Sequence, residues 1–263
     1  MGRGQVFWGI ILLLAGFVFL LDNMGLLGNL DAWNVLWPLG LIAFGIWTLW
    51  GSAFRRAPAM EHARVPLDGA TRARVRMSHG AGRLTLTAGA DMDTLLEGDF
   101  GGGLDLNTQK HGDELDVRMS VPVQVFPFSS GPGYTLDWNL RFNPEAALEL
   151  ELEAGAGETR LDLSELPVHR LRLKTGASHS VINLPASAGF TRADISSGAA
   201  QIDIHIPSGV AASIRTRGGL SSMQVDQTRF PRFGDRYQSP DYDEALNKVE
   251  LDVEMGVGGV NIR

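Results

Sequence analysis

The sequence predicts a membrane-anchored, mainly β protein, in which an N-terminal two-helix transmembrane hairpin precedes a C-terminal β-solenoid-like repeat domain. Three observations support this fold class. Residues 1–56 are strongly apolar and carry only five charged side chains. The remainder holds most of the charge, together with short stretches in which polar and apolar residues alternate, as is typical of strands. A Gly-Ala dipeptide recurs there at intervals of 21 and 22 residues.

The composition excludes several kinds of protein. The 263 residues have a formal net charge of −7 and include no cysteine. A disulfide framework, a thiolate metal site and a cysteine nucleophile are therefore ruled out. The acidic balance argues against a nucleic-acid partner, because phosphates attract basic surfaces.

The N-terminal unit, residues 1–54, contains two uncharged apolar segments. They cover residues 5–21 and 35–54, and a helix needs roughly 17–25 such residues to cross a bilayer. A cleaved signal peptide is the first alternative, but no small-x-small cleavage site follows Leu21. A buried soluble hairpin is the second, but neither segment has a polar face. Both segments are predicted to span the membrane.

Arginines predict the orientation of this hairpin, because basic residues concentrate on the cytoplasmic side. Arg3 precedes the first span, and Arg55, Arg56 and Arg64 follow the second, whereas the connecting loop has no basic residue. We therefore expect a multi-pass protein with both termini and the β-domain in the cytoplasm.

Residues 55–66 are expected to form a linker, and residues 67–263 the repeat domain. Each repeat begins with Gly-Ala and contains two short alternating strands. The units begin at Gly155, Gly176 and Gly198, with earlier copies from Gly80 and Gly101, and "MGVGGVNIR" is expected to close the array as a half unit. Such a unit cannot bury its apolar face alone, so the units must stack. The predicted interior comprises Leu161, Leu171, Val181, Ile195, Ile202 and Ile214.

Ser178, His179 and Ser180 raise the question of a nucleophile held in a glycine turn. In the repeat alignment, Ser178 and His179 occupy the positions of Gly157 and Glu158, where the chemistry is unrelated. Adjacent residues of a strand also point to opposite faces. The segment is therefore interpreted as a corner between strands.

The other polar motifs do not indicate a catalytic or ligand-binding site either. "DFGGGLDL" is not followed by a helical pattern, so it lacks the helix N-terminus that favours phosphate binding. "DYDE", residues 241–244, lacks the glycine and spaced ligands of an EF-hand loop and is interpreted as a solvated turn. We predict no catalytic, cofactor-binding or metal-binding residue, and no cofactor.

The sequence resembles a known family in both of its parts. "LLDN" after the first apolar segment and "LWPL" at the start of the second resemble the transmembrane segment of LiaI- and LiaF-like bacterial proteins. "GAGETRLDLSELPVHRLRLKTGAS" resembles the toast-rack β-repeat domain of LiaF-like cell-envelope stress proteins and of related adhesin-like proteins. The resemblance implies the bacterial inner (cytoplasmic) membrane, no catalytic residues, and a partner sensor histidine kinase.

These observations together predict a non-enzymatic regulator or scaffold in bacterial cell-envelope stress signalling, which acts by protein–protein contact. The expected partners are the lipid bilayer, a sensor histidine kinase or other membrane signalling protein, and further copies of the chain. The candidate partner surface comprises Phe230, Phe233, Tyr237 and Tyr242; alternatively, these aromatic residues cap the end of the core. The alternative function is an envelope-facing adhesin-like or structural β-repeat module, which requires the opposite topology.

Overall fold

The computed structural model describes Trp37 and residues 60–122 and 136–263 of the chain. The chain divides into two compact units, Met1–Arg56 and Ala57–Arg263. Apart from Trp37, the predicted spans 5–21 and 35–54 lie outside the described residues. Within the described parts, no helix is long and apolar enough to cross a membrane.

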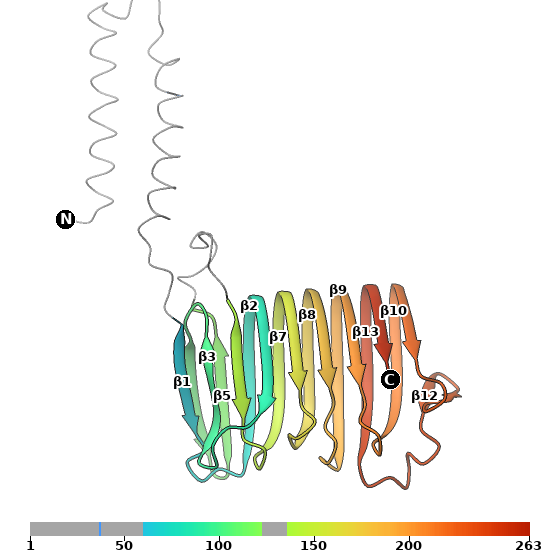
Figure 1. The fold of residues 1–263 in the computed structure, drawn as a ribbon, viewed down its shortest axis with the longest axis horizontal. Helices are drawn as coiled ribbons and strands as arrows, with labels where there is room; N and C mark the ends of the chain where they lie inside the picture. Colours follow the sequence, from blue (N-terminus) through green and yellow to red (C-terminus); the bar gives the residue numbers. More distant parts are fainter. Residues whose placement is uncertain (1–36, 38–59, 123–135) are drawn as a thin grey trace, which may run out of the picture. The chain divides into compact units, whose positions relative to one another are not determined.

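The second unit is a single 13-stranded sheet. Its strands are β1 (Glu61–Pro66), β2 (Arg72–Ala88), β3 (Thr94–Phe100), β4 (Asp105–His111), β5 (Glu114–Ser120), β6 (Trp138–Phe142), β7 (Ala147–Asp162), β8 (Val168–Asn183), β9 (Phe190–His205), β10 (Ala211–Val225), β11 (Arg232–Phe233), β12 (Arg236–Gln238) and β13 (Lys248–Ile262). Figure 1 shows the long strands stacked side by side in a row.

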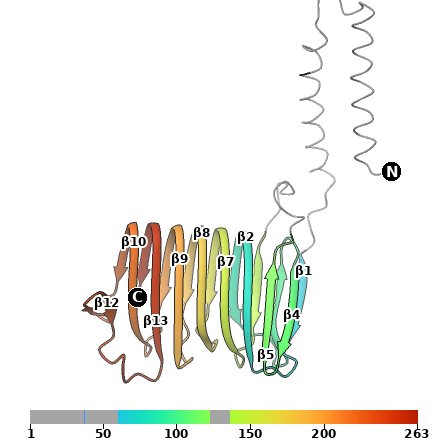
Figure 2. The same cartoon turned by 180° about the vertical axis from the view of Figure 1, so that it is seen from behind.

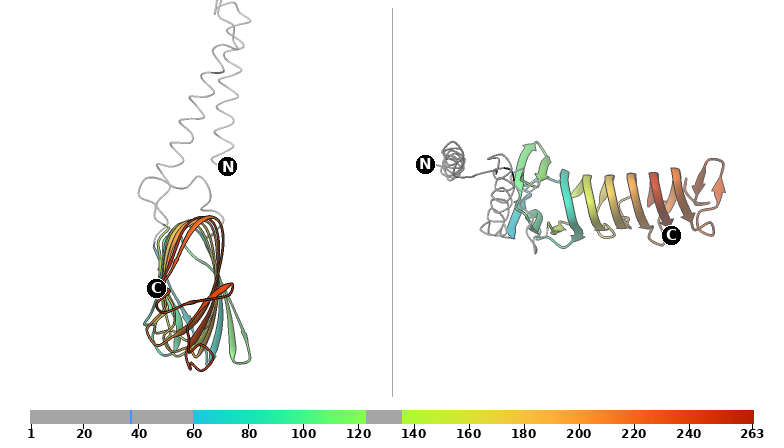
Figure 3. Two further views of the ribbon diagram at one scale, coloured as in Figure 1. Left: turned by 90° about the vertical axis from the view of Figure 1, so that its right-hand side faces the viewer. Right: turned by 90° about the horizontal axis from the view of Figure 1, so that it is seen from above.

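Each long strand bends over at a glycine-containing corner and forms an arch with two arms (Figures 1 and 3). The corner is Gly-Ala in β2, β7, β8 and β9, Gly-Gly in β10 and Gly-Val in β13. In β7, the buried residues of the first arm are Leu148, Leu150 and Leu152, and those of the second arm are Thr159 and Leu161. The buried positions therefore change from even to odd numbers across the corner. This change of phase is required because both arms must direct their apolar side chains into the space between them.

The arches stack as parallel strands in the register that the repeat alignment predicts. Ala156 pairs with Ala177, and Ala177 pairs with Ala199. Ala81 of β2 pairs with Ala156, so the copy predicted from Gly80 is the preceding arch. Loops at the feet of the arms connect one arch to the next (Figure 1).

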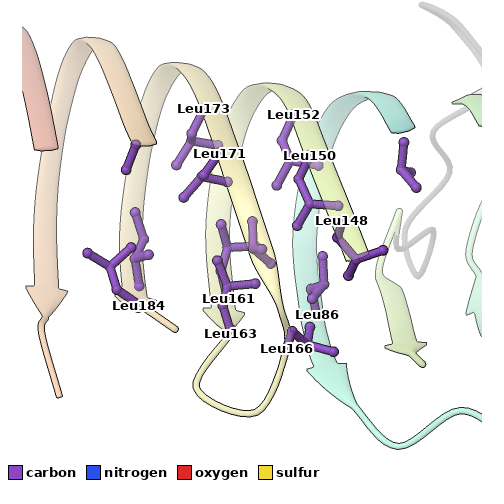
Figure 4. Packing of buried hydrophobic residues seen from close by; sticks show 14 of the residues in the cluster. Leu86, Leu148, Leu150, Leu152, Leu161, Leu163, Leu166, Leu171, Leu173 and Leu184 are labelled. Atoms are coloured by element: carbon purple, nitrogen blue, oxygen red, sulfur yellow. The ribbon is translucent and has the colours of Figure 1, made fainter. Parts of the chain in front are cut away.

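The hydrophobic core fills the space between the two arms of every arch. Figure 4 shows leucines of β7 and β8, such as Leu150, Leu171 and Leu161, directed into this space. Five of the six predicted interior residues are buried there, but Val181 is not. Its neighbours Ser180 and Ile182 point inward instead, so Val181 lies on the outer face beside Arg160 and Asp203.

At the N-terminal end of the row, the two arms of β2 have different neighbours. β5 pairs with the first arm and β6 with the second, and β3 and β1 follow β6. β1 occupies Glu61–Pro66, so these residues, expected in the 55–66 linker, belong to the sheet. The predicted copy from Gly101 is wrong, because β4 and β5 form an antiparallel hairpin rather than an arch.

The C-terminal strand does not close the array as a half unit. β13 is a full arch of 15 residues that lies between β9 and β10 and pairs in parallel with both. β10 is therefore the outermost arch, although it precedes β13 in the sequence. Figure 2 shows β12 beyond β10 at this end and β1 and β4 at the opposite end.

Candidate interaction surface

Ser178, His179 and Ser180 lie just beyond the corner of β8 and do not form a catalytic arrangement. The Ser180 side chain is fully buried, and its Oγ lies 3.3 Å from Oγ of Ser178. The exposed His179 ring faces the opposite way, with Nε2 3.5 Å from Oδ2 of Asp203. Ser178 pairs with Gly157 and Ala200, as the repeat alignment predicts. The imidazole therefore serves neither hydroxyl as a base.

Acidic and histidine side chains show no metal-binding arrangement in the residues that the structure describes. No three of them converge on a common point in residues 60–122 and 136–263. Asp241 and Asp243 of the "DYDE" segment lie in an exposed turn. Gly101 and Gly102 form the turn after β3, where Gly101 N donates a hydrogen bond of 2.9 Å to the Asp137 carbonyl oxygen.

An open groove of about 960 Å³ follows the tops of the arches. Its lining includes one glycine from the corner of each of five neighbouring arches: Gly80, Gly155, Gly176, Gly198 and Gly256. Its border carries charges of both signs, including Glu153, Lys174 and Glu254. His79 also lines it, but this ring is almost completely buried and bonded to the Leu136 carbonyl oxygen at 2.6 Å.

The four aromatic residues of the predicted partner surface lie in the segment between β10 and β13, at the C-terminal end of the row. Phe230 is fully buried and belongs to the core. The guanidinium group of Arg229 lies 4.8 Å from the centre of its ring, and donates hydrogen bonds to the carbonyl oxygens of Ile206 and Pro207 at 2.7 and 3.0 Å. Phe230 therefore caps the core, as the alternative interpretation expects.

Tyr237 and Tyr242 are half-buried and support this end of the domain. Tyr237 of β12 pairs with Ile214 of β10 and packs against the core. The ammonium group of Lys248 lies 5.5 Å from the centre of the Tyr242 ring. Burial, with smaller effects from the nearby Glu250 and Asp243 carboxylates, raises the pKa of Tyr242 above its usual value.

Phe233 differs from the other three, because 72% of its surface is exposed. It ends β11, and a tight turn at Gly234 leads to β12. The hairpin is fixed to the outermost arch, since the Ser239 N–H donates to the Ala212 carbonyl oxygen at 2.8 Å and the Ala212 N–H donates to Ser239 Oγ at 2.9 Å. Phe233 is thus an exposed aromatic side chain on a well-anchored support.

Charged residues surround the Phe233 hairpin. Asp235 lies 3.7 Å from Arg215 of β10 and 3.6 Å from Arg236 of β12, measured between carboxylate oxygen and guanidinium nitrogen. An exposed aromatic ring within a charged rim is the usual composition of a protein contact site. We call Phe233, Asp235, Arg236 and the neighbouring Arg215 the end surface.

The stacked arches and their glycine-containing corners define a β-repeat module. The family model for the N-terminal domain of toast_rack matches residues 56–205. The model for the LiaI-LiaF-like transmembrane region matches residues 6–49. The chain therefore belongs to the toast-rack family, with a LiaI-LiaF-like transmembrane region before the β-domain, and the resemblance noted in the sequence is confirmed.

A solved structure shares the fold of the β-domain. A proposed cell adhesion protein from Clostridium sporogenes ATCC 15579 matches with a TM-score of 0.71 and 21% identity, over 78% of this chain and 98% of its own. A proposed adhesin from Bacteroides fragilis NCTC 9343 covers the same shares at 10% identity, with a TM-score of only 0.31. The search of curated proteins found no match.

Proposed function

We propose that the chain is a non-enzymatic, membrane-anchored regulator or scaffold in bacterial cell-envelope stress signalling. Its β-domain lies in the cytoplasm and contacts a sensor histidine kinase or another membrane signalling protein through the end surface. Membership of the toast-rack family and the LiaI-LiaF-like transmembrane region support this proposal. The observation that supports it most directly is the exposed Phe233 ring, which lies on a hairpin that is hydrogen-bonded to the outermost arch.

A substitution at Phe233 tests the proposed contact without disturbing the fold, because the side chain is exposed. We expect Phe233→Ala to alter the transcriptional response to a cell-wall-active antibiotic while the protein stays at its normal level in the membrane. Met92→Ala is the matched control, because Met92 is 75% exposed but lies before β3, at the other end of the row. An unchanged response of the Phe233→Ala cells would contradict the proposed contact.

An envelope-facing, adhesin-like role is the second candidate function. It is favoured by the similarity of fold to the proposed cell adhesion protein from Clostridium sporogenes. This role requires the β-domain outside the cytoplasm. Protease treatment of a C-terminal tag distinguishes the two candidates: cleavage only in inverted membrane vesicles supports the signalling role, and cleavage in intact spheroplasts supports the adhesin-like role.

A further inference from the structure

The outer edge of β10 is a largely unpaired strand edge. On its inner side, β10 pairs with β13 from Ala211 to Val225. On its outer side, β12 covers only Ser213 and Ile214. From Arg215 onward, none of the strands among the described residues pairs with this side of β10. An edge of this kind is a template for a further strand.

The direction of the backbone groups at this edge follows from Ala212. Its N–H and carbonyl oxygen are both bonded to Ser239, on the outer side. Alternate residues of a strand direct their backbone groups to the same edge. Thr216 therefore presents its N–H and carbonyl oxygen outward, just beyond the part that β12 covers.

The outward-facing side chains of the first arms show which charges neighbouring arches prefer. Several pairs across neighbouring strands have opposite charges: Arg172 lies 3.4 Å from Glu151, and Lys174 lies 3.3 Å from Glu153, whereas Asp194 of β9 is paired with Asp252 of β13. At the end of the row, Arg215 and Arg217 face Asp252 and Glu254 of β13. An additional strand beyond β10 would meet these two arginines, which favour acidic residues at the facing positions.

The inward-facing positions of β10 show what else this strand must carry. In β13, Val253, Val260 and Ile262 are buried. The residues of β10 in the same register are Thr216, Met223 and Val225, and all three are only half-buried. Beyond the part that Phe230 caps, the core is therefore incompletely covered at this end, and apolar side chains at alternate positions of an added strand would cover it.

We propose that the outer edge of β10 binds an extended acidic segment of a partner protein, in which acidic and apolar residues alternate, as an added strand. The proposal rests on the proposed function and specifies the chemistry of the partner. β13 provides the internal precedent, since its first arm places Glu250, Asp252 and Glu254 opposite Ser213, Arg215 and Arg217 of β10. Main-chain hydrogen bonds would supply affinity, and the two arginines would supply selectivity.

A synthetic peptide with the sequence of residues 248–255, Lys-Val-Glu-Leu-Asp-Val-Glu-Met, tests the proposal with the full-length protein in detergent. We expect saturable binding by fluorescence anisotropy that weakens as the salt concentration rises. The same peptide with lysine at its three acidic positions should bind much more weakly. In the Arg217→Glu variant, this preference should be reduced or reversed.

Two variants of Thr216 test whether the peptide pairs with the edge. Thr216→Pro removes the outward N–H and should weaken peptide binding at least tenfold. The variant should still fold, because proline is tolerated in an edge strand where the N–H faces solvent. Thr216→Val retains the N–H and should bind normally. Equal binding to both variants would overturn the proposal, as would the absence of binding to the unaltered protein.

Light scattering of the same samples distinguishes a different occupant. A doubled mass that Thr216→Pro returns to the single-chain value would mean that a second copy occupies the edge, and this would also overturn the proposal. The failure of the peptide test leaves the proposed function intact if Phe233→Ala still alters the stress response. The two ideas therefore fail independently.

Discussion

Gly157 of β7 lies so close to Gly82 of β2 that a Cβ atom on Gly157 would overlap the carbonyl oxygen of Gly82. The two residues are paired in the sheet although 75 positions separate them in the sequence. Gly157 also has a φ of 132°, a backbone conformation that other residues rarely adopt. The same relationship holds between Gly258 and Ala200. Close approach at the corners is thus a condition for stacking the arches.

We predict that Gly157→Ala lowers the free energy of unfolding by about 3 kcal/mol, because the positive φ and the overlap with Gly82 both oppose a side chain. Gly80→Ala is the control, since a Cβ there would have no neighbour within 4 Å and its φ is not positive. It should cost less than about 1 kcal/mol. Denaturant unfolding measures both values, and equal costs would contradict the role of the corner.

Phe230 and Phe233 should differ sharply in their effect on stability. Phe230 is fully buried, so Phe230→Ala leaves a cavity at the end of the core and should cost about 3–5 kcal/mol. Phe233→Ala should change stability by less than about 0.5 kcal/mol, because an exposed side chain contributes little. Thermal unfolding of the two variants checks this. A large loss in Phe233→Ala would mean that Phe233 supports the fold rather than a contact.

His79 should make the stability of the β-domain depend on pH. Burial lowers the pKa of His79 below its usual value, and the hydrogen bond to the Leu136 carbonyl oxygen offsets this only in part. Because that carbonyl can only accept, Nε2 carries the proton of the neutral ring. A second proton on Nδ1 would place a positive charge in the core beside Trp138, whose ring centre lies 5.1 Å away.

The sign of the effect follows from proton binding in the two states. Below about pH 6.5 the unfolded histidine binds a proton, whereas the folded one does not until the pH reaches its lower pKa. Stability is therefore full above about pH 6.5 and falls as the pH decreases, by at most about 1.4 kcal/mol per pH unit. The free energy of unfolding measured across this range should decrease less steeply in His79→Gln. An identical slope in both proteins would contradict the prediction.

Glu97 should contribute more to stability than the other carboxylates that form ion pairs at the surface. It is almost buried on β3, and its oxygens lie 2.8 Å from the guanidinium groups of both Arg64 and Arg141. Removing these charge-assisted hydrogen bonds with Glu97→Ala should cost about 2 kcal/mol. Glu153→Ala breaks only the exposed pair with Lys174 and should cost less than about 0.5 kcal/mol. Urea unfolding would contradict the prediction if the two costs were equal.

The sequence was sufficient to predict the stacking of the central arches, because the repeat period and the alternation of Leu and Ile determine the register. It was not sufficient to predict which face of the strand Val181 occupies. "SVIN" has apolar residues at adjacent positions, and a shift of one residue exchanges the buried and the exposed face. The position of β13 between β9 and β10 was also missed. Strand order in a parallel sheet is not limited by sequence order when a long connection, here residues 226–247, links two arches.

The candidate surface was predicted as a segment but not residue by residue. Phe230 and Phe233 are three positions apart in "RFPRF", and only the three-dimensional structure shows that one enters the core and the other does not. The free edge of β10 was missed, because an edge depends on which strands are neighbours. The sequence contained one indication that β10 differs from the central arches. Leu220 occupies the corner position where the central arches have Ala156, Ala177 and Ala199, and its side chain is 84% exposed.

Site-specific photo-crosslinking in living cells tests the central claim, contact through the end surface, most directly. A photoreactive phenylalanine analogue would replace Phe233 in one strain and the equally exposed Met92 in another. The account predicts a discrete crosslinked product with a membrane signalling protein from position 233 and none from position 92. The same product from both positions, or none from position 233 in a folded and membrane-bound protein, would contradict it.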